Sequence, residues 1–350
     1  MWYIYPVEKN IGGSIVTTRI AINGFGRIGR LALRRILEID SDLEVVGINS
    51  TTDSDHLAYL FMFDTAYGKV PYKVETEEDA IIIDGKRIKI YMERDPKNIP
   101  WRELDVDIVL ECTGVFLTNE DCQGHIDAGA KKVIISAPAK DDVTKLIVYG
   151  INHEIIEAED TIISSASCST NCLAPMAKVL HDSFGLKSGV MTTIHAYTSS
   201  QVVLDKRTKN YRGGRAAAVN IIPYKTGAAK ALGQVIPELE GIVDGTAMRV
   251  PVITGSVIEF YSNLEKTVTV EEVNAAMKAA SNDAFEYNEY EIVSSDIIGS
   301  TAGSVFDATL TKIVENDDDC QLVKTVAWYD NEYGYTCNMI RLVEYVGSLS

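Results

Sequence analysis

Residues 19–30 read RIAINGFGRIGR, an apolar run followed by three glycines in the pattern G-x-G-x-x-G. The apolar run predicts a buried strand, and the apolar residues that follow the turn recur at helical spacing. Gly24, Gly26 and Gly29 permit a tight turn, close approach of the backbone to a pyrophosphate, and packing of the helix on the strand. Because the turn opens a helix, its free N–H groups favour an anion. This placement favours dinucleotide binding over an ordinary glycine-rich turn.

The second strand of this unit ends without the carboxylate that usually accompanies the glycine pattern. Residues 43–48 read as a strand, and the chain continues with Asn49 and Ser50. In dinucleotide-binding folds an acid about 20 residues after the glycines holds the ribose 2′-hydroxyl. Asp53 and Asp55 come later and read as helix-start residues. Ser50 would not repel a 2′-phosphate, so NADP stays open as a cofactor beside NAD.

Strands and helices alternate beyond this first unit. Buried-strand patterns follow at 106–111 and 132–136, with a helical pattern between them. Alternation of this kind predicts an α/β fold with a doubly wound parallel sheet. After about Ser164 the chain changes to longer β-rich runs, at 189–197, 248–253 and 255–260. The change predicts a second domain built on a different plan.

The composition excludes several classes of protein. The 350 residues include 33 basic and 50 acidic side chains, a formal charge of −17, and 46% are hydrophobic, as in a globular protein with a sizeable core. The negative charge repels nucleic-acid phosphates and anionic lipids, so neither partner is expected. No apolar stretch approaches the roughly 18 residues of a membrane span, and residues 1–18 do not have the pattern of a signal peptide. Six scattered cysteines without a C-x-x-C pair indicate a reducing compartment, and we expect a cytoplasmic protein.

One cysteine differs from the others in its surroundings. Cys168 lies in the hydroxyl-rich segment 164–172, which leads directly into a helical pattern. A helix start favours the thiolate, so we predict that Cys168 titrates well below a free thiol and acts as a nucleophile. Cys172 lies one turn further on, and because no other ligands with suitable spacing accompany the pair, a metal site is not expected. We interpret the remaining cysteines as buried structural residues: Cys112, Cys122, Cys320 and Cys337.

A histidine and several arginines are candidates for the same site. Among five histidines, only His195 ends an apolar strand pattern and is followed by polar residues. Taken alone it is equally compatible with a structural role, but a cysteine nucleophile needs an imidazole partner, and His195 is the best placed. Residues 212–215, the Thr226–Gly227 turn and Arg249 set arginines and glycines close together, which suggests oxyanion recognition. Each arginine taken singly is equally compatible with an ordinary surface ion pair.

These motifs together resemble one family, the phosphorylating glyceraldehyde-3-phosphate dehydrogenases. The match runs in order from about residue 19 to the C-terminus. The segments that carry it are INGFGRIGR (22–30), ECTGVF (111–116), KKVIISAPAK (131–140), SASCSTNCLAP (165–175), HAYT (195–198), RGGRAAAVNIIP (212–223), TGAAKA (226–231) and WYDNEYGY (328–335).

The resemblance implies a domain organisation. It implies a Rossmann-type doubly wound parallel sheet and an α+β catalytic domain with a mostly antiparallel sheet. Residues 1–18 would form an N-terminal extension. The dinucleotide-binding domain would span 19–166 and be joined by a C-terminal helix at 333–350, and the catalytic domain would span 167–332.

The resemblance also implies a role for each matching residue. Cys168 is then the nucleophile and His195 the base. The residues that match the inorganic-phosphate region are Ser167, Ser169, Arg215, Thr226 and Gly227, and those that match the substrate-phosphate site are Thr198 and Arg249. Besides the three glycines, the residues that match cofactor contacts are Arg27, Ile28, Arg94, Thr113, Ser136, Asn331 and Tyr335, the last two beside the nicotinamide.

The implied reaction is the oxidative phosphorylation of glyceraldehyde 3-phosphate to 1,3-bisphosphoglycerate with NAD or NADP, in a homotetramer. The chain departs from the family at Ser50, where an acid is usual, and at Lys206 and Arg207, in a loop that in this family reaches the neighbouring subunit's adenosine. Both departures predict that NADP is accepted. Two alternatives stay open: an erythrose-4-phosphate dehydrogenase, whose thioester is hydrolysed, and a non-catalytic Rossmann protein that senses a dinucleotide.

Overall fold

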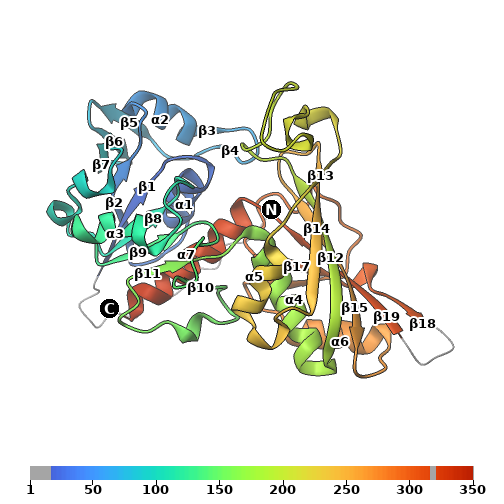
Figure 1. Cartoon of the computed structure of the whole chain (residues 1–350). Helices are drawn as coiled ribbons and strands as arrows, with labels where there is room; N and C mark the ends of the chain where they lie inside the picture. Colours follow the sequence, from blue (N-terminus) through green and yellow to red (C-terminus); the bar gives the residue numbers. More distant parts are fainter. Residues whose placement is uncertain (1–16, 316–320, 350) are drawn as a thin grey trace.

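The computed structural model describes residues 17–315 and 321–349 (Figure 1). Within these residues the chain forms two large sheets, of nine and eight strands. Figure 1 shows the first sheet with its helices on one side of the molecule and the second sheet on the other. Most of the predicted extension 1–18 lies outside the described residues, and the first strand begins at Thr18.

The first sheet is the predicted parallel one. Its six pairings among β10, β11, β9, β8, β1, β2 and β7 are all parallel, and a hairpin continues it antiparallel at one edge. The strand order is β10 (Lys145–Leu146), β11 (Ile162–Ser164), β9 (Lys132–Ile135), β8 (Ile108–Glu111), β1 (Thr18–Asn23), β2 (Leu43–Asn49), β7 (Lys86–Tyr91), β6 (Ala80–Ile83) and β5 (Val74–Glu77). From β1 the chain goes first to β2 on one side and later to β8 on the other, so the order reverses at β1. Such a switch point opens a crevice at the carboxyl ends of the strands.

The second sheet is mostly antiparallel. Its order is β13 (Ile222–Tyr224), β14 (Val243–Val250), β12 (Leu186–Ala196), β15 (Ser256–Leu264), β19 (Gln321–Tyr329), β17 (Ser304–Asp307) and β16 (Phe285–Asn288), with β18 (Lys312–Glu315) also paired to β19. The pair β12–β14 is parallel, as is β16–β17. A short hairpin of β3 (Phe63–Asp64) and β4 (Gly68–Lys69) stands apart. The two sheets confirm the predicted fold class.

The strand predicted at 248–253 is misplaced. β14 begins five residues earlier and ends at Val250. Its first half includes Asp244 and Gly245, which are poor strand formers and hide the strand in the sequence. Pro251 has no N–H to continue the ladder, so the strand stops before it.

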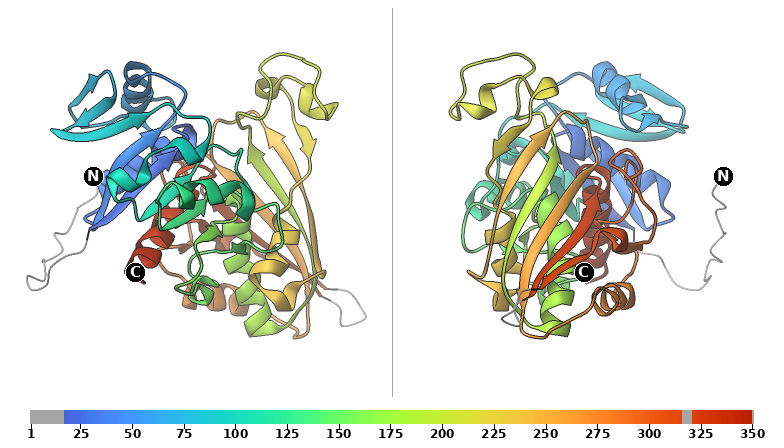
Figure 2. Two further views of the ribbon diagram at one scale, coloured as in Figure 1. Left: turned by 60° about the vertical axis from the view of Figure 1, so that its left-hand side comes forward. Right: turned by 90° about the vertical axis from the view of Figure 1, so that its right-hand side faces the viewer.

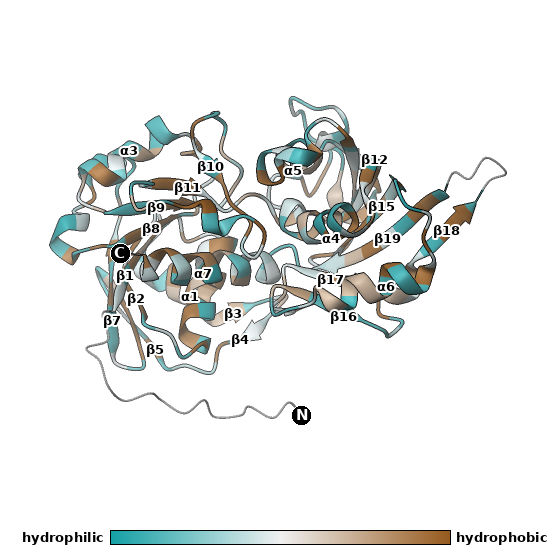
Figure 3. Cartoon of the chain, turned by 90° about the horizontal axis from the view of Figure 1, so that it is seen from below, coloured by the Kyte–Doolittle hydropathy of each residue, from teal (hydrophilic) through white to brown (hydrophobic). Residues whose placement is uncertain are grey.

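Helices cover both sheets. They are α1 (Arg27–Glu38), α2 (Ser54–Met62), α3 (Asn119–Asp127), α4 (Cys168–Phe184), α5 (Ala228–Val235), α6 (Val270–Ala279) and α7 (Tyr333–Ser348). The C-terminal helix α7 packs on α1 and also contacts α4, so it joins the first sheet to the start of the second part of the chain. Figure 3 shows apolar residues along strands such as β8 and β9, which the helices cover. None of the helices in the described ranges is long and apolar enough to cross a membrane.

The segment between β12 and β13, residues 197–221, projects from the body of the molecule (Figure 2). Several of its apolar side chains are exposed, among them Val203, Leu204 and Tyr211. The predicted cations Lys206 and Arg207 lie exposed on the same segment.

Candidate active site

The predicted nucleophile begins a helix, as the sequence suggests. α4 starts at Cys168, and the side chain of Ser167 caps it by accepting a hydrogen bond from the Thr170 N–H. Before the cap, Ala166 has a left-handed backbone with φ of 59°. Such a conformation in a non-glycine residue costs about 1–2 kcal/mol and marks a sharp change of direction. The turn takes the chain from the end of β11 into α4 and leaves Cys168 at the helix start.

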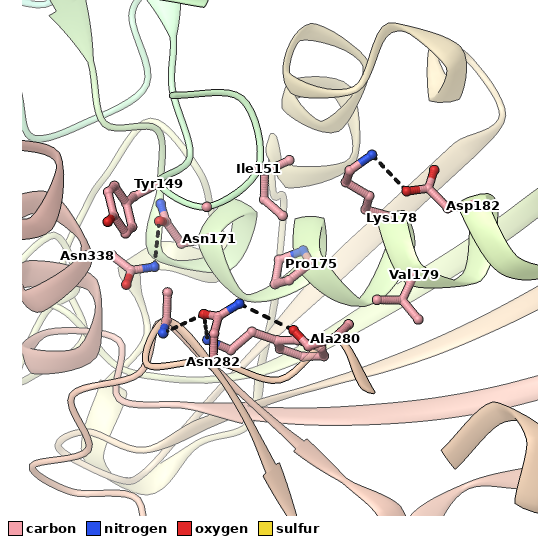
Figure 4. Close-up of a pocket in the computed structure, with 13 residues that line it drawn as sticks. Tyr149, Ile151, Asn171, Pro175, Lys178, Val179, Asp182, Ala280, Asn282 and Asn338 are labelled. Carbon is pink, nitrogen blue, oxygen red and sulfur yellow. Dashed lines mark hydrogen bonds and ion pairs between the residues drawn. The ribbon is translucent and has the colours of Figure 1, made fainter. Parts of the chain in front are cut away.

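The amide of Asn171 holds this turn in place. Its Nδ2 donates to the carbonyls of Ser165 and Ser167, both at 3.0 Å, and its Oδ1 accepts from Asn338 of α7 at 3.2 Å. Figure 4 shows the pair of asparagines at the edge of a cavity of about 170 Å³ beside α4. The position of Cys168 therefore depends on contacts between α4 and the C-terminal helix.

Strand pairing brings the imidazole to the thiol. His195 is the next-to-last residue of β12, and its Nε2 lies 3.4 Å from the Sγ of Cys168. β12 and β14 run parallel with His195 opposite Arg249, so the arginine lies directly beside the imidazole. The ring of Tyr329 from β19 packs edge-on against His195 at 5.8 Å between centroids. The structure thus assembles Cys168, His195 and Arg249, which are far apart in the sequence.

Tyr329 also ties the helix start to the strand. Its hydroxyl lies 2.9 Å from the Ser169 Oγ and 2.7 Å from the Thr193 Oγ1. Burial raises the pKa of Tyr329 well above its ordinary value, so the phenol stays neutral. Tyr329 is a positioning group that was not predicted from the sequence, and its place in the segment WYDNEYGY is the signal that could have revealed it.

The prediction of a lowered pKa for Cys168 is wrong. Part of the residue is exposed, but its thiol is deeply buried, and burial raises the pKa above the ordinary value of a thiol. The charge of Arg249 and hydrogen bonds to Ser169 act in the opposite direction and do not offset the burial. A helix start and a nearby imidazole are visible in sequence, whereas the desolvation of the thiol is a property of the folded site.

The imidazole of His195 is neutral. Burial first, and the charge of Arg249 second, lower the pKa of His195 to about 3. The Nε2 of the imidazole lies 3.4 Å from the Sγ of Cys168, within reach of the proton that a general base would take.

The residues predicted to bind the phosphate of the substrate, Thr198 and Arg249, follow β12 and lie at the end of β14. The Thr198 hydroxyl lies 2.9 Å from the Ser200 Oγ, two residues after the end of β12. Arg249 donates to the Ala196 carbonyl at 3.0 Å, and its Nε is buried without a partner in the described residues. An unpaired buried donor of this kind is costly, and an anion would satisfy it.

The residues predicted to bind inorganic phosphate are less tightly assembled than Cys168, His195 and Arg249. Arg215 is exposed and forms an ion pair with Asp205 at 2.8 Å. Thr226 accepts a hydrogen bond from the Ala228 N–H at 3.2 Å, and Gly227 is the exposed N-cap of α5. Ser169 is buried against Tyr329.

A second cavity, of about 550 Å³, opens at the switch point of the first sheet. The ends of β1 and β2 form its floor through Asn23 and Asn49, and Ser50 lies directly after β2. The predicted cofactor residues that line it are Gly24, Gly26, Ser50, Arg94 and Thr113. The cavity lies where parallel α/β sheets bind dinucleotides.

The glycine turn fits a pyrophosphate. A Cβ at Gly24 would lie 2.7 Å from the Thr113 backbone nitrogen, so only glycine allows β1 and the loop after β8 to approach. Gly26 precedes α1, and a Cβ at this position would have no other atom within 4 Å, so the space beside it is open. No side chain caps α1 and no acid lies in its first turn, so its N–H groups remain free for an anion.

Other predicted cofactor residues lie outside this cavity. Gly29 is buried where α1 packs on β1, and Ile28 is partly buried beside it. The guanidinium of Arg27 binds the carboxylates of Asp64 and Glu332. Ser136 follows β9 and donates its N–H to the Glu111 carbonyl.

Asn331 lies just before α7, and Tyr335 lies in the first turn of that helix. The Oδ1 of Asn331 accepts from the Ser256 hydroxyl at 2.8 Å, which orients the amide. The Tyr335 hydroxyl lies 2.7 Å from the Ser165 Oγ and donates to the Ala166 carbonyl at 3.2 Å, at the turn before Cys168. Lys206 and Arg207 do not line the cavity that contains Ser50.

A buried polar network beneath the glycine turn was not predicted. Glu111, at the end of β8, accepts from the Asn23 amide at 2.5 Å and from the Thr113 N–H at 2.8 Å. His125 of α3 lies 3.2 Å from the same carboxylate and accepts from the Trp101 indole at 3.0 Å. A charged residue at the end of the apolar run IVLE is the signal that could have revealed it. The network fixes the ends of β1 and β8, which carry the glycine turn and Thr113.

The other described cysteines have thiols that lie in the protein interior, as predicted for structural residues. Burial raises the pKa of the Cys112, Cys122, Cys172 and Cys337 thiols, the first, second and last to about 12. Cys320 lies outside the described residues. In the described ranges no three His, Cys, Asp or Glu side chains lie together in a way that could hold a metal ion.

Comparison with known proteins identifies the family. Residues 18–119 match the NAD-binding domain of glyceraldehyde 3-phosphate dehydrogenase, and residues 167–331 match its C-terminal domain. The chain is 57% identical over 335 residues to the glyceraldehyde-3-phosphate dehydrogenase of Clostridium pasteurianum, covering 95% of this chain and 99% of the relative. It is 55% identical over 334 residues to that of Clostridium acetobutylicum, covering 95% and 99%. It is 52% identical over 340 residues to that of Lactobacillus delbrueckii subsp. bulgaricus, covering 95% and 100%. With both domains matched and this identity along nearly the whole chain, the protein belongs to the glyceraldehyde-3-phosphate dehydrogenase family.

Proposed function

We propose that this protein oxidises glyceraldehyde 3-phosphate with NAD and transfers the acyl group to inorganic phosphate, which yields 1,3-bisphosphoglycerate. The observation that carries the proposal is the thiol of Cys168, 3.4 Å from the Nε2 of a neutral His195 and beside Arg249. Family membership supports the reaction, and the free N–H groups of α1 support the cofactor.

The first step is addition of the thiol to the aldehyde. The Nε2 of His195 takes the thiol proton, and the Sγ of Cys168 forms a bond to the aldehyde carbon. The new oxyanion is stabilised by the Cys168 backbone N–H at the helix start and by the protonated imidazole. Arg249 and Thr198 bind the phosphate of the substrate and hold the aldehyde beside the thiol.

The second step is oxidation of the hemithioacetal. Bound NAD supplies the hydride acceptor. The protonated His195 first returns its proton to the oxyanion, which gives the hemithioacetal hydroxyl and a neutral imidazole. As the former aldehyde carbon loses its hydride, the Nε2 of His195 removes the hydroxyl proton, and a thioester on Cys168 remains. Inorganic phosphate, held by the residues Ser167, Ser169, Arg215, Thr226 and Gly227, attacks the thioester carbon, and the Cys168 thiolate leaves.

The two anion sites should respond to different substitutions. We expect Arg249→Ala to raise KM for glyceraldehyde 3-phosphate about 10- to 100-fold, because a charged hydrogen bond contributes roughly 1.5–3 kcal/mol. Thr198→Ala should raise the same KM by a smaller factor. Thr226→Ala should mainly raise KM for inorganic phosphate, by about 3- to 10-fold. Steady-state kinetics with each substrate varied in turn measure both constants, and equal effects of all three substitutions on both constants would contradict two separate sites.

Ser50 is proposed to let the site accept NADP as well as NAD. Ser50 follows β2 and lines the cavity at the switch point of the first sheet, and Asp53, the first acid after β2, caps α2, which supports the proposal. We expect Ser50→Asp to shift the ratio of kcat/KM values toward NAD by about 10-fold or more, because a carboxylate repels a 2′-phosphate and binds a 2′-hydroxyl. The matched control is Ser50→Asn, because asparagine has the size of aspartate but no charge. This substitution should leave the ratio of kcat/KM values nearly unchanged. An unchanged ratio in Ser50→Asp, or a wild-type enzyme that strongly favours NAD, would refute NADP acceptance.

We also propose a division into domains and an assembly for this protein. Residues 19–166 with 333–350 form the dinucleotide-binding domain, residues 167–332 form the catalytic domain, and residues 1–18 are an extension. The protein acts in the cytoplasm as a homotetramer. Lys206 and Arg207, exposed on the projecting segment, approach the adenosine of a neighbouring subunit in that assembly. If the two side chains bind there, the double substitution Lys206→Ala and Arg207→Ala should weaken the binding of NADP more than the binding of NAD.

A further inference from the structure

Three buried side chains connect the C-terminal helix to the turn before the nucleophile, and we call them the relay. Arg341 of α7 donates through NH1 to the Asn338 Oδ1 at 2.8 Å. The Asn338 Nδ2 donates to the Asn171 Oδ1 at 3.2 Å, a contact drawn in Figure 4. The Asn171 Nδ2 donates to the carbonyls of Ser165 and Ser167, both at 3.0 Å. Asn171 and Asn338 are only 2% and 3% exposed, so bulk water does not compete for these bonds.

The chemistry of the two ends fixes the direction of every bond in the relay. A guanidinium can only donate, so the Asn338 atom that faces Arg341 is its oxygen. A carbonyl can only accept, so the Asn171 atom that faces the two serine carbonyls is its nitrogen. The Asn338 nitrogen then faces the Asn171 oxygen. Reversing either amide alone would set oxygen against oxygen at one of its contacts and nitrogen against nitrogen at the other.

The last donor of the relay acts on a turn that needs support. Ala166, between the two carbonyls that Asn171 binds, has φ of 59°, which is unfavourable for a residue with a side chain. The Tyr335 hydroxyl donates to the Ala166 carbonyl at 3.2 Å, so three successive carbonyls are held by side chains of α4 and α7. This turn determines where α4 begins, and therefore where the thiol of Cys168 lies.

Resting on the function proposed above, we propose that Asn338 and Arg341 are positioning residues for Cys168, which act on it through Asn171. Arg341 is itself fixed by the carbonyls of Thr301 and Asp283, each at 2.8 Å, in the segments before β17 and after α6. The relay therefore anchors the turn of the nucleophile to the far side of α7. It holds the thiol where it can add to the aldehyde, so a disturbed relay slows acylation and leaves the affinity for the aldehyde unchanged.

A comparison of Asn338→Asp with Asn338→Ala tests the direction of the relay. Aspartate keeps the shape of asparagine and can pair with Arg341, but it presents an oxygen to the Asn171 Oδ1. Asn171 must then turn its amide, which sets an oxygen against the carbonyls before Cys168 and releases the turn. Alanine only removes a donor, and the adjoining cavity of about 170 Å³ can supply a water molecule in its place. Aspartate should therefore be the more harmful substitution.

Single-turnover NADH formation at saturating NAD and glyceraldehyde 3-phosphate measures acylation by the folded enzyme. We expect Asn338→Asp to slow it about 10- to 100-fold, because displacing a reacting group by about 1 Å can cost as much. Asn338→Ala should slow it by less than about threefold, because a bridging water replaces most of a lost hydrogen bond. KM for the aldehyde should change little in either variant, because Thr198 and Arg249 are unaltered.

Asn152→Asp is the matched control. Asn152 is also buried, and its Nδ2 donates to the Leu146 carbonyl at 2.9 Å while its Oδ1 accepts from the Val148 N–H at 2.8 Å. Aspartate there removes a donor from a carbonyl in the same way, but away from the turn before Cys168. We expect a lower thermal stability and an unchanged rate of acylation.

A merely structural role predicts the opposite order, because aspartate fills the volume of asparagine and pairs with Arg341, whereas alanine leaves a hole. An Asn338→Asp enzyme that forms NADH at least as fast as Asn338→Ala would therefore overturn the relay. If Asn338→Asp does not fold, Asn171→Asp against Asn171→Ala decides in the same way, because aspartate at that position also sets an oxygen against the two serine carbonyls. These outcomes leave the acyl group on Cys168 of the wild type intact, whereas failure of the proposed function would appear as wild-type NADH formation without an adduct on Cys168.

Discussion

Replacing Cys168 by serine should abolish oxidation of glyceraldehyde 3-phosphate, with a loss of about 10⁴-fold or more in kcat, while NAD binding stays near that of the wild type. A serine hydroxyl in the same place is far less acidic than a thiol, and a neutral imidazole at 3.4 Å does not activate it to a comparable nucleophile. We expect NAD binding to be retained because the cavity at the switch point of the first sheet is lined by residues at the ends of β1, β2 and β8 and not by Cys168. Stopped-flow measurement of NADH formation and a fluorescence titration with NAD give the two quantities.

The matched control is Cys172→Ser, one turn further along α4. Its sulfur already accepts a hydrogen bond from the Ser304 hydroxyl and is fully buried. We expect some loss of stability and little loss of turnover by the folded enzyme. Activity retained by Cys168→Ser and lost by Cys172→Ser would show that the wrong cysteine has been assigned.

Replacing His195 by asparagine should lower the rate of acylation by about 10²- to 10⁴-fold, the range for loss of a general base. Asparagine can keep a hydrogen bond near the thiol but cannot take its proton. The residual rate should rise with pH, because the thiol must then ionise without help and burial raises the pKa of Cys168. Single-turnover NADH formation between about pH 6 and 10 provides the profile.

The control for this substitution is His56→Asn, in the exposed face of α2. It should leave both the rate and its pH dependence unchanged. A His195→Asn enzyme with the wild-type acylation rate would mean that another group takes the thiol proton.

The first βαβ unit was predictable because the residues that define it lie close together in the sequence. Gly24 marks a close approach that only glycine allows, and the apolar pattern on either side of the turn defines β1 and α1. The start of α4 at Cys168 was predictable for the same reason, since Ser167 is a typical cap directly before a helical pattern. The absence of an acid at Ser50 was also evident from the sequence alone.

The arrangement around the base was not predictable from local patterns. The parallel pairing of β12 with β14 sets Arg249 opposite His195, and no feature of either strand specifies that partner or register. The raised pKa of Cys168 depends on burial by chain segments distant in sequence, and the network of Glu111 and His125 joins residues from three elements. These properties arise from tertiary packing. Sequence motifs were therefore enough to identify the residues of the site, but the pKa shifts and polar contacts at the site could be derived only from the folded structure.

The central claim is that oxidation proceeds through an acyl group on Cys168 that inorganic phosphate removes. The most direct measurement is mass spectrometry of the peptide containing Cys168 after the enzyme is mixed with NAD and glyceraldehyde 3-phosphate without inorganic phosphate. We predict one 3-phosphoglyceroyl adduct per chain, on Cys168, which persists until phosphate is added and then leaves as 1,3-bisphosphoglycerate. NADH formation without an adduct on Cys168, or an adduct lost to water at the same rate with and without phosphate, would contradict the account.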